Sequence, residues 1–201
     1  LDAIDNLVGQ GKTIALESGN LREEETRLIE KGSKCRIIAA EGIFSELRKI
    51  KSKKEVERLE KSVAITEAAI EYSSRQVKSG MTERDLEKIY KKRLIELGAE
   101  PGFCLIGFGP HSAESCIPSE IALKEGDIVL YDVGCSYKGY ASDIARTFLF
   151  EYSDSEIEMK YDILKKGMDK EISLIENGAC TSDIFRETMR YIREEGAKRG
   201  I

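Results

Sequence analysis

Two aspartates stand in β-rich runs that a short connection joins. Asp132 lies in the run 128–134 and Asp143 in the run 140–150, and residues 135–139 separate the two. This pattern predicts a β-hairpin. If the turn is centred between Tyr137 and Lys138, Asp132 and Asp143 face each other directly, with their Cβ atoms roughly 4.5–5.5 Å apart.

Like charges at this separation destabilise a sheet, so a positive partner is expected between the two carboxylates. A divalent cation bound through carboxylate oxygens fits, and one carboxylate could bridge to a second ion. The alternative is that the aspartates lie on an exposed sheet face or pair with Lys138 and Arg146. A bulge in the connection would also change the pairing.

The segment before these strands reads as short α/β units. Strands are predicted at 13–16 and 35–40, with a charged helix at 22–30 between them. About 50 residues can hardly bury a core of their own. We therefore expect residues 1–51 to be the end of a larger N-terminal α/β domain.

A helix-helix-sheet unit is predicted next, followed by the start of its duplicate. Gly80, Asp85 and Gly98 recur with the same spacing 98 residues later, as Gly178, Asp183 and Gly196. An amphipathic helix precedes each set, at 55–78 and 156–175, and Thr82 is a candidate N-cap for a second helix that stops at Gly98. The strands predicted in the first unit, 103–108, 127–134 and 140–150, have no counterpart after Gly196.

Composition excludes several classes of function. The net charge of -5, with 34% charged residues, gives no basic excess for nucleic acid. No apolar run is long enough for a membrane helix, and the N-terminus has no secretory signal pattern, so a cytoplasmic location is expected. The five scattered cysteines form no CxxC pair, which argues against a disulfide framework and a structural zinc site.

Two motifs resemble the creatinase / methionine aminopeptidase superfamily. They are Lys124–Gly134 (KEGDIVLYDVG) and Gly139–Phe148 (GYASDIARTF), and Arg48–Val56 is similar to the linker of the Xaa-Pro peptidase branch. The resemblance implies an α+β pita-bread fold, here its first half and the start of its second. An incomplete catalytic domain is then expected at 52–201, after the N-terminal remnant at 1–51.

The resemblance further implies a centre of two divalent ions (Mn, Co, Zn or Fe) held by two Asp, one His and two Glu. Asp132 would bind one ion, and Asp143 would bridge both. A metal-activated hydroxide would attack the scissile carbonyl. Thr147 would support the bridging carboxylate, unless it is a plain strand residue.

The sequence departs from the family pattern at several ligands. The remaining His and Glu ligands are expected beyond Ile201, and the histidine that normally precedes the Ile-Pro-Ser stretch is replaced by Ser115-Cys116. His111, the only histidine, is therefore the candidate for a catalytic role, and a solvated loop residue is its alternative. Cys116 is either a weak metal contact or a small loop residue.

These observations predict a metal-dependent Xaa-Pro dipeptidase or aminopeptidase that acts on short peptides with proline at the second position. The chain as given is expected to be inactive and to hold metal poorly or not at all. A methionine aminopeptidase-like enzyme and a non-catalytic pita-bread binding module remain alternatives. A homodimer is left open.

Overall fold

The computed structural model describes residues 6–9, 11–17, 19, 21–32, 34–114 and 117–200. The chain divides into two compact units, Leu1–Lys61 and Ser62–Ile201, and each is described by itself. The boundary between the units falls within the helix α4 (Lys53–Ser74). The division into domains at 51/52 stays a prediction.

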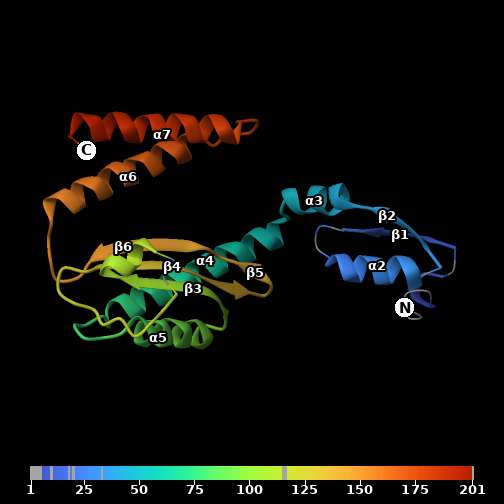
Figure 1. The fold of residues 1–201 in the computed structure, drawn as a ribbon, viewed down its shortest axis with the longest axis horizontal. Helices are drawn as coiled ribbons and strands as arrows, with labels where there is room; N and C mark the ends of the chain where they lie inside the picture. Colours follow the sequence, from blue (N-terminus) through green and yellow to red (C-terminus); the bar gives the residue numbers. More distant parts are fainter. Residues whose placement is uncertain are drawn as a thin grey trace. The chain divides into compact units, whose positions relative to one another are not determined.

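The first unit contains a small parallel sheet. Strand β1 (Thr13–Leu16) pairs with β2 (Arg36–Ala39), and the charged helix α2 (Glu23–Gly32) connects them (Figure 1). Helix α3 (Glu41–Lys49) follows β2. The predicted strands and helix of this segment are all present, and their ends differ by at most two residues.

The second unit is built on an antiparallel sheet. Its central strand is β4 (Ile128–Tyr137), which pairs with β3 (Glu100–Phe108) on one side and with both β5 (Tyr140–Ala141) and β6 (Ile144–Leu149) on the other. The short 3-10 helix η2 (Gly109–Ala113) follows β3. Helices α4 and α5 (Glu83–Glu96) precede the sheet in the chain and lie on one face of it (Figure 1).

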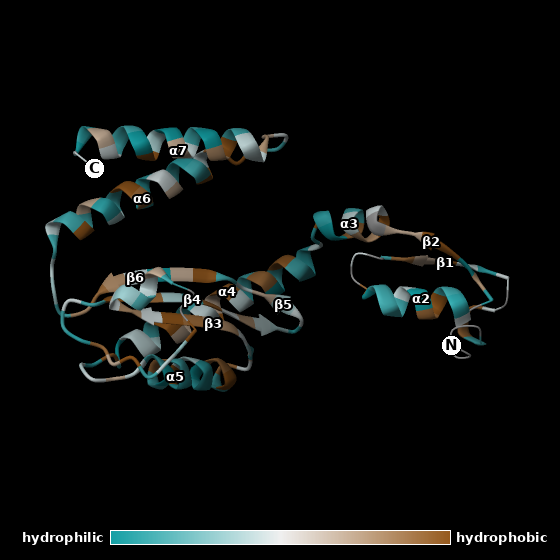
Figure 2. Cartoon of the chain, viewed as in Figure 1, coloured by the Kyte–Doolittle hydropathy of each residue, from teal (hydrophilic) through white to brown (hydrophobic). Residues whose placement is uncertain are grey.

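The two faces of β4 differ in burial. Val129, Tyr131, Val133 and Cys135 are at most 1% exposed and belong to the core that α4 and α5 cover. The alternate residues of a strand point to the opposite face, so Asp132 lies on the face away from these helices. The hydrophobic segments of β3 and β4 stand out in Figure 2, next to the mostly hydrophilic surface of α5.

Helix α5 begins as its sequence predicts. The Thr82 hydroxyl accepts a hydrogen bond from the Asp85 amide, and the Asp85 carboxylate accepts one from the Thr82 amide. This reciprocal capping box satisfies two amides that the first helical turn leaves without a partner. The α5 residues Leu86, Tyr90 and Leu94 are then fully buried against the sheet.

Helices α6 (Ser155–Leu174) and α7 (Thr181–Lys198) pack on each other after the sheet. Helix α7 begins 98 residues after α5, and Gly80 and Gly178 both have positive φ (79° and 89°), in line with the predicted duplication. Gly196 differs from its counterpart Gly98, because it lies inside α7 rather than at a helix end.

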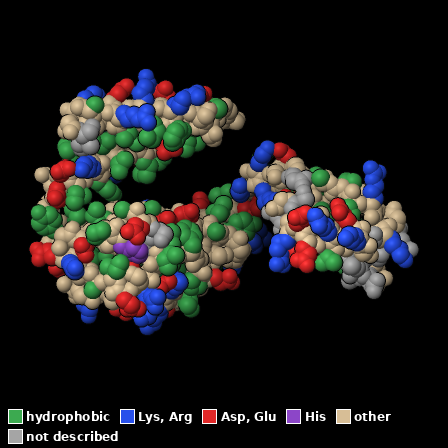
Figure 3. Space-filling model, in the orientation of Figure 1, with side chains coloured by type: hydrophobic (Ala, Val, Ile, Leu, Met, Phe, Trp, Pro, Cys, Tyr) green, Lys and Arg blue, Asp and Glu red, His purple; other side chains and the backbone are tan. Residues whose placement is uncertain are grey.

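Several apolar side chains remain exposed on α6. Tyr161, Leu164, Met168 and Ile172 are 48–58% exposed, and green side chains gather along one side of the α6–α7 pair in Figure 3. Among the described residues, no helix is both long and apolar enough to cross a membrane.

Candidate metal centre

The turn of the hairpin fixes the register of the two aspartates. Lys138 and Gly139 form a two-residue turn with φ values of 51° and 82°, and Tyr137 pairs with Tyr140 across it. Positive φ at both central residues is the mark of a type I′ turn, whose twist suits a hairpin. The predicted turn centre, between Tyr137 and Lys138, is therefore wrong by one residue.

Asp132 consequently pairs with Ala145. The prediction that Asp132 and Asp143 face each other directly is therefore wrong. The same register holds on both sides of Asp143, with Ser136 opposite Ala141 and Val133 opposite Ile144. It places Asp143 beside Gly134, two residues along β4 from Asp132. Residues two apart share a face, so the two aspartates are diagonal neighbours on the open face of the sheet.

The electrostatics of the pair agree with this placement. Asp132 is half-buried and Asp143 is exposed. Burial raises the pKa of Asp132, and the nearby charge of Asp143 raises that pKa further. The like-charge repulsion expected from the sequence is present, although the two residues are not directly opposed.

The neighbouring cations do not neutralise the pair. Arg146 forms an ion pair with Glu67 of α4, 3.0 Å between Nη2 and Oε1, and the Lys138 ammonium lies 5.4 Å from the centre of the Tyr137 ring. Within the described ranges, neither aspartate forms an ion pair. The alternative reading, in which Lys138 and Arg146 balance the aspartates, is not what the structure shows.

The two carboxylates suit a hard or borderline divalent cation, because both offer ionisable oxygen donors on one face. In the part of the chain that the structure describes, no group of three or more His, Cys, Asp or Glu side chains gathers to hold a metal ion. Asp132 and Asp143 therefore fit two ligands of a metal centre and do not complete one.

Thr147 lies on the same face of β6 as Ala145, two residues away, and follows Asp143 by four residues; it pairs with Leu130. Its side chain is half-buried. No hydrogen bond joins its hydroxyl to Asp143 among the residues described. Support of Asp143 by Thr147 stays a prediction.

His111 lies in η2 and contacts a buried glutamate rather than the aspartates. Its Nδ1 atom is 2.8 Å from Oε1 of Glu83, whose side chain is fully buried. His111 does not form a metal-binding group with Asp132 and Asp143 in the described structure. The predicted catalytic role of His111 therefore has no geometric support at the aspartates.

Glu83 is a residue that the sequence analysis missed. Its carboxylate accepts hydrogen bonds from the amides of Phe108 and Ser119 and from the Ser119 hydroxyl, at 2.7–2.9 Å. Burial raises the pKa of Glu83, but the hydrogen bonds from His111, Ser119 and Phe108 together outweigh it and hold the pKa below its usual value. An acidic residue in a first helical turn is ordinarily exposed, so no local pattern marks this one as buried.

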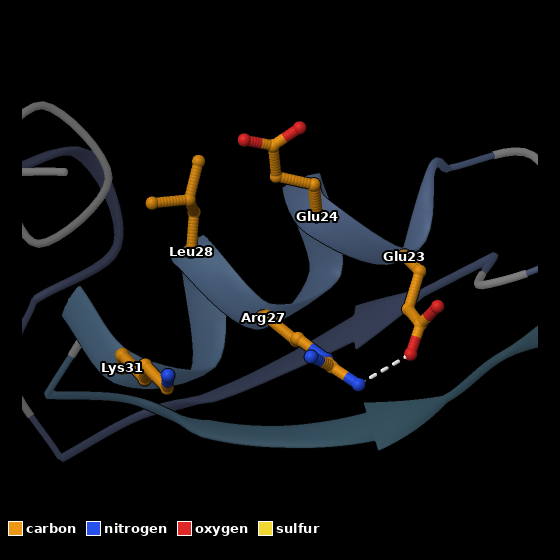
Figure 4. Close-up of a pocket in the computed structure, with 5 residues that line it drawn as sticks. All are labelled: Glu23, Glu24, Arg27, Leu28 and Lys31. Atoms are coloured by element: carbon orange, nitrogen blue, oxygen red, sulfur yellow. Dashed lines mark hydrogen bonds and ion pairs between the residues drawn. The ribbon is translucent and has the colours of Figure 1, made fainter.

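The loop residues Ser115 and Cys116 lie outside the described residues, so the expectation for Cys116 is not addressed. A separate pocket lies on α2 of the first unit, lined by Glu23, Glu24, Arg27, Leu28 and Lys31 (Figure 4). The Arg27 guanidinium pairs with Glu23 at 2.5 Å, one turn away on the same helix. This is a solvated charged helix surface, and we assign no function to it.

An antiparallel sheet with helices on one face and two unneutralised carboxylates on the other defines an α+β protein with a candidate metal centre. The comparison with known families is more specific. Residues 57–201 match metallopeptidase family M24, and the chain belongs to this family.

Solved structures confirm the pita-bread fold. Prolidase from Pyrococcus furiosus aligns with a TM-score of 0.88 at 25% identity, over 98% of this chain and 59% of that one. The Xaa-Pro dipeptidase from Bacillus anthracis also gives 0.88 at 25% identity, over 97% and 56%. The X-Pro aminopeptidase from Thermotoga maritima gives 0.88 at 22% identity, over 97% and 55%.

Among curated proteins, an uncharacterised peptidase of Staphylococcus saprophyticus is 31% identical over 153 residues, covering 75% of this chain and 44% of that protein. One of Staphylococcus aureus is 30% identical over 156 residues, covering 76% and 44%. The chain thus spans less than half the length of these curated relatives.

Proposed function

We propose that the gene product containing this chain is a peptidase for Xaa-Pro bonds in short peptides, and that Asp132 and Asp143 are two of its metal ligands. The observation that carries the proposal is the placement of both aspartates on one sheet face, where neither Lys138 nor Arg146 pairs with them. Membership of metallopeptidase family M24 and the likeness to prolidase and Xaa-Pro dipeptidase structures support it.

In this proposal the sheet holds the two carboxylates at a fixed separation, ready to bind cations. Burial and then the charge of Asp143 raise the pKa of Asp132, and a bound cation would relieve the repulsion between the two carboxylates. Divalent ions bound there would lower the pKa of a water and polarise the scissile carbonyl. Mn, Co, Zn and Fe all remain candidates, because oxygen donors alone do not separate them.

Two carboxylates make a weak site, so the 201-residue chain alone is expected to be inactive and to bind metal poorly. The remaining ligands, a cytoplasmic location and a homodimer stay part of the proposal. Tight, stoichiometric Mn²⁺ binding by the 201-residue chain in calorimetry would contradict the expectation of a weak site.

The decisive assay compares Xaa-Pro dipeptide hydrolysis by the gene product, loaded with Mn²⁺ or Co²⁺, with that of two variants. Asp143→Asn removes one proposed ligand and should lower kcat/KM by at least about a hundredfold. Asp169→Asn changes an exposed carboxylate on α6 and serves as the matched control. Unchanged activity of Asp143→Asn would remove the proposed role.

Two other functions are distinguished by substrate and by ligand content. Faster cleavage of Met-Ala than of Xaa-Pro peptides would favour a methionine aminopeptidase-like enzyme. Absence of any hydrolysis, together with absence of a metal-ligating His and two Glu from the gene product, would favour a non-catalytic binding module.

A further inference from the structure

The chain between β5 and β6 is irregular at Ser142 and Asp143. Ser136 pairs with Ala141 before this point and Val133 pairs with Ile144 after it. The same register therefore holds on both sides of the irregular segment, so neither strand has an extra residue there. The irregularity must come from the orientation of the peptide groups at Ser142 and Asp143.

A side chain replaces one bond of the ladder. The Ser142 amide donates to the Cys135 carbonyl at 2.9 Å, and in a regular antiparallel pair the Cys135 amide would donate back to the Ser142 carbonyl. Instead, the Cys135 amide donates to the Ser142 hydroxyl oxygen at 3.2 Å. Ser142 thus takes part in the ladder with its side chain.

The displaced carbonyl has moved to the face that carries the aspartates. The Ser142 carbonyl oxygen lies 2.0 Å from the position that a Cβ atom on Gly134 would occupy. Gly134 and Asp132 share a face of β4, so the peptide between Ser142 and Asp143 is turned toward the candidate metal centre. Only glycine at position 134 leaves room for this arrangement.

Helix α4 supplies hydroxyls that hold the irregular segment. Thr66 Oγ1 lies 2.8 Å from Ser142 Oγ, and Ser62 Oγ donates to the Cys135 carbonyl at 3.2 Å. Ser62 and Thr66 are fully buried and Ser142 is 6% exposed. Hydroxyls destabilise an apolar core unless they are partnered, so three together at this irregular part of the ladder indicate a specific role.

We propose that Ser142 and Thr66 are positioning residues for Asp143. Their hydrogen bond keeps the peptide before Asp143 turned out of the ladder, and this peptide sets the direction in which the Asp143 carboxylate leaves the strand relative to Asp132. This inference rests on the proposed function, because the direction of the Asp143 carboxylate matters only if Asp143 is a metal ligand.

Ser142→Ala and Thr66→Val remove the two hydroxyls, and Thr66→Val keeps the volume of the side chain. Ser73→Ala is the matched control, because Ser73 is a buried hydroxyl on the same helix that bonds to Tyr131 and lies outside the irregular segment. Residual dipolar couplings of the labelled, metal-free chain would report the orientation of the Asp143 N–H bond. Line broadening by Mn²⁺ would report weak cation binding near the aspartates.

We expect Ser142→Ala and Thr66→Val to reorient the Asp143 N–H bond and to weaken Mn²⁺ binding roughly tenfold, the loss typical of groups that orient a ligand. Ser73→Ala should lower stability without either effect, and Thr66→Ser should behave like the parent chain. An unchanged N–H orientation in Ser142→Ala and Thr66→Val would overturn the proposal, as would an equal loss of Mn²⁺ binding in Ser73→Ala. If Mn²⁺ broadens no resonance near Asp132 in the parent chain, as a site of two ligands allows, the N–H orientation alone decides the positioning role.

Discussion

Asp143 lies diagonally across the hairpin from Asp132, on the same face of the sheet and beside Gly134. Direct opposition would place the carboxylates closer together than the diagonal arrangement does. The diagonal leaves more space between the side chains, which suits a cation bound between carboxylates. The observed pair is repulsive without one.

Asp143→Asn should lower the pKa of Asp132 toward its ordinary value, because the neighbouring negative charge is lost while burial remains. A carboxyl whose pKa is raised on folding binds more protons when folded, so stability falls as the pH rises from the ordinary value through the raised one. Asp143→Asn should make this fall smaller. Carboxyl ¹³C titration and urea unfolding between about pH 3 and 7 would measure both effects, and an unchanged pKa of Asp132 would contradict the placement of the pair.

Glu83→Gln should lower the free energy of unfolding by roughly 2–4 kcal/mol, since a buried carboxylate with several donors would be replaced by a group that is itself a donor. Glu87→Gln on the same helix, which breaks a surface pair with Lys91, should change it by less than about 1 kcal/mol. Chemical denaturation compares the two variants.

Glu83 should also make the free energy of unfolding depend on pH in the acidic range. Its pKa is lower in the folded chain than the ordinary value of 4.5, so its contribution is complete above that pH and is lost as the pH falls through the folded value. The Glu83→Gln variant should lack this part of the acid unfolding profile. The same acid profile in both proteins would show that Glu83 is not the group responsible.

The turn at Lys138 and Gly139 offers a paired test of the register. Lys138→Asn should raise stability by about 0.5–1 kcal/mol, because asparagine accepts positive φ more readily than lysine. Gly139→Ala should lower it by about 1 kcal/mol or more, because alanine has no such freedom. Thermal unfolding would show opposite shifts of the midpoint, and shifts in the same direction would argue against this turn.

Two cysteines of the second unit should differ in reactivity. Burial raises the pKa of Cys104 to about 12, whereas a hydrogen bond with Ser182 lowers the pKa of the exposed Cys180 below 9.0. At pH 8 Cys180 should therefore carry a much larger thiolate fraction than Cys104. Alkylation by iodoacetamide, followed by peptide mapping, should modify Cys180 first, and equal rates in the native chain would contradict the raised pKa of the half-buried Cys104.

Local sequence signals predicted most elements of the fold. The apolar run at 35–40, the Thr82 cap and the glycines near the helix ends act within a few residues, and the elements they mark are present in the structure. The register of the hairpin was missed because Lys138 carries a positive φ that lysine seldom adopts.

The contacts of the candidate site were predicted less well. Glu83 and His111 are 28 residues apart, and Thr66 and Ser142 are 76 apart, so only the folded chain brings each pair together. The aspartates themselves were found because the motif around them is contiguous. The residues that contact this segment, such as Thr66, were not predicted, because a serine or threonine on an amphipathic helix does not indicate its hydrogen-bond partner.

The two-residue turn decides on which side of the sheet the acidic pair meets. A slip of the pairing by one residue would carry Asp143 to the helix-covered side, away from Asp132. A residue added between Tyr137 and Tyr140 therefore keeps both acids on one side only where a longer loop absorbs it and the strand pairing stays as it is.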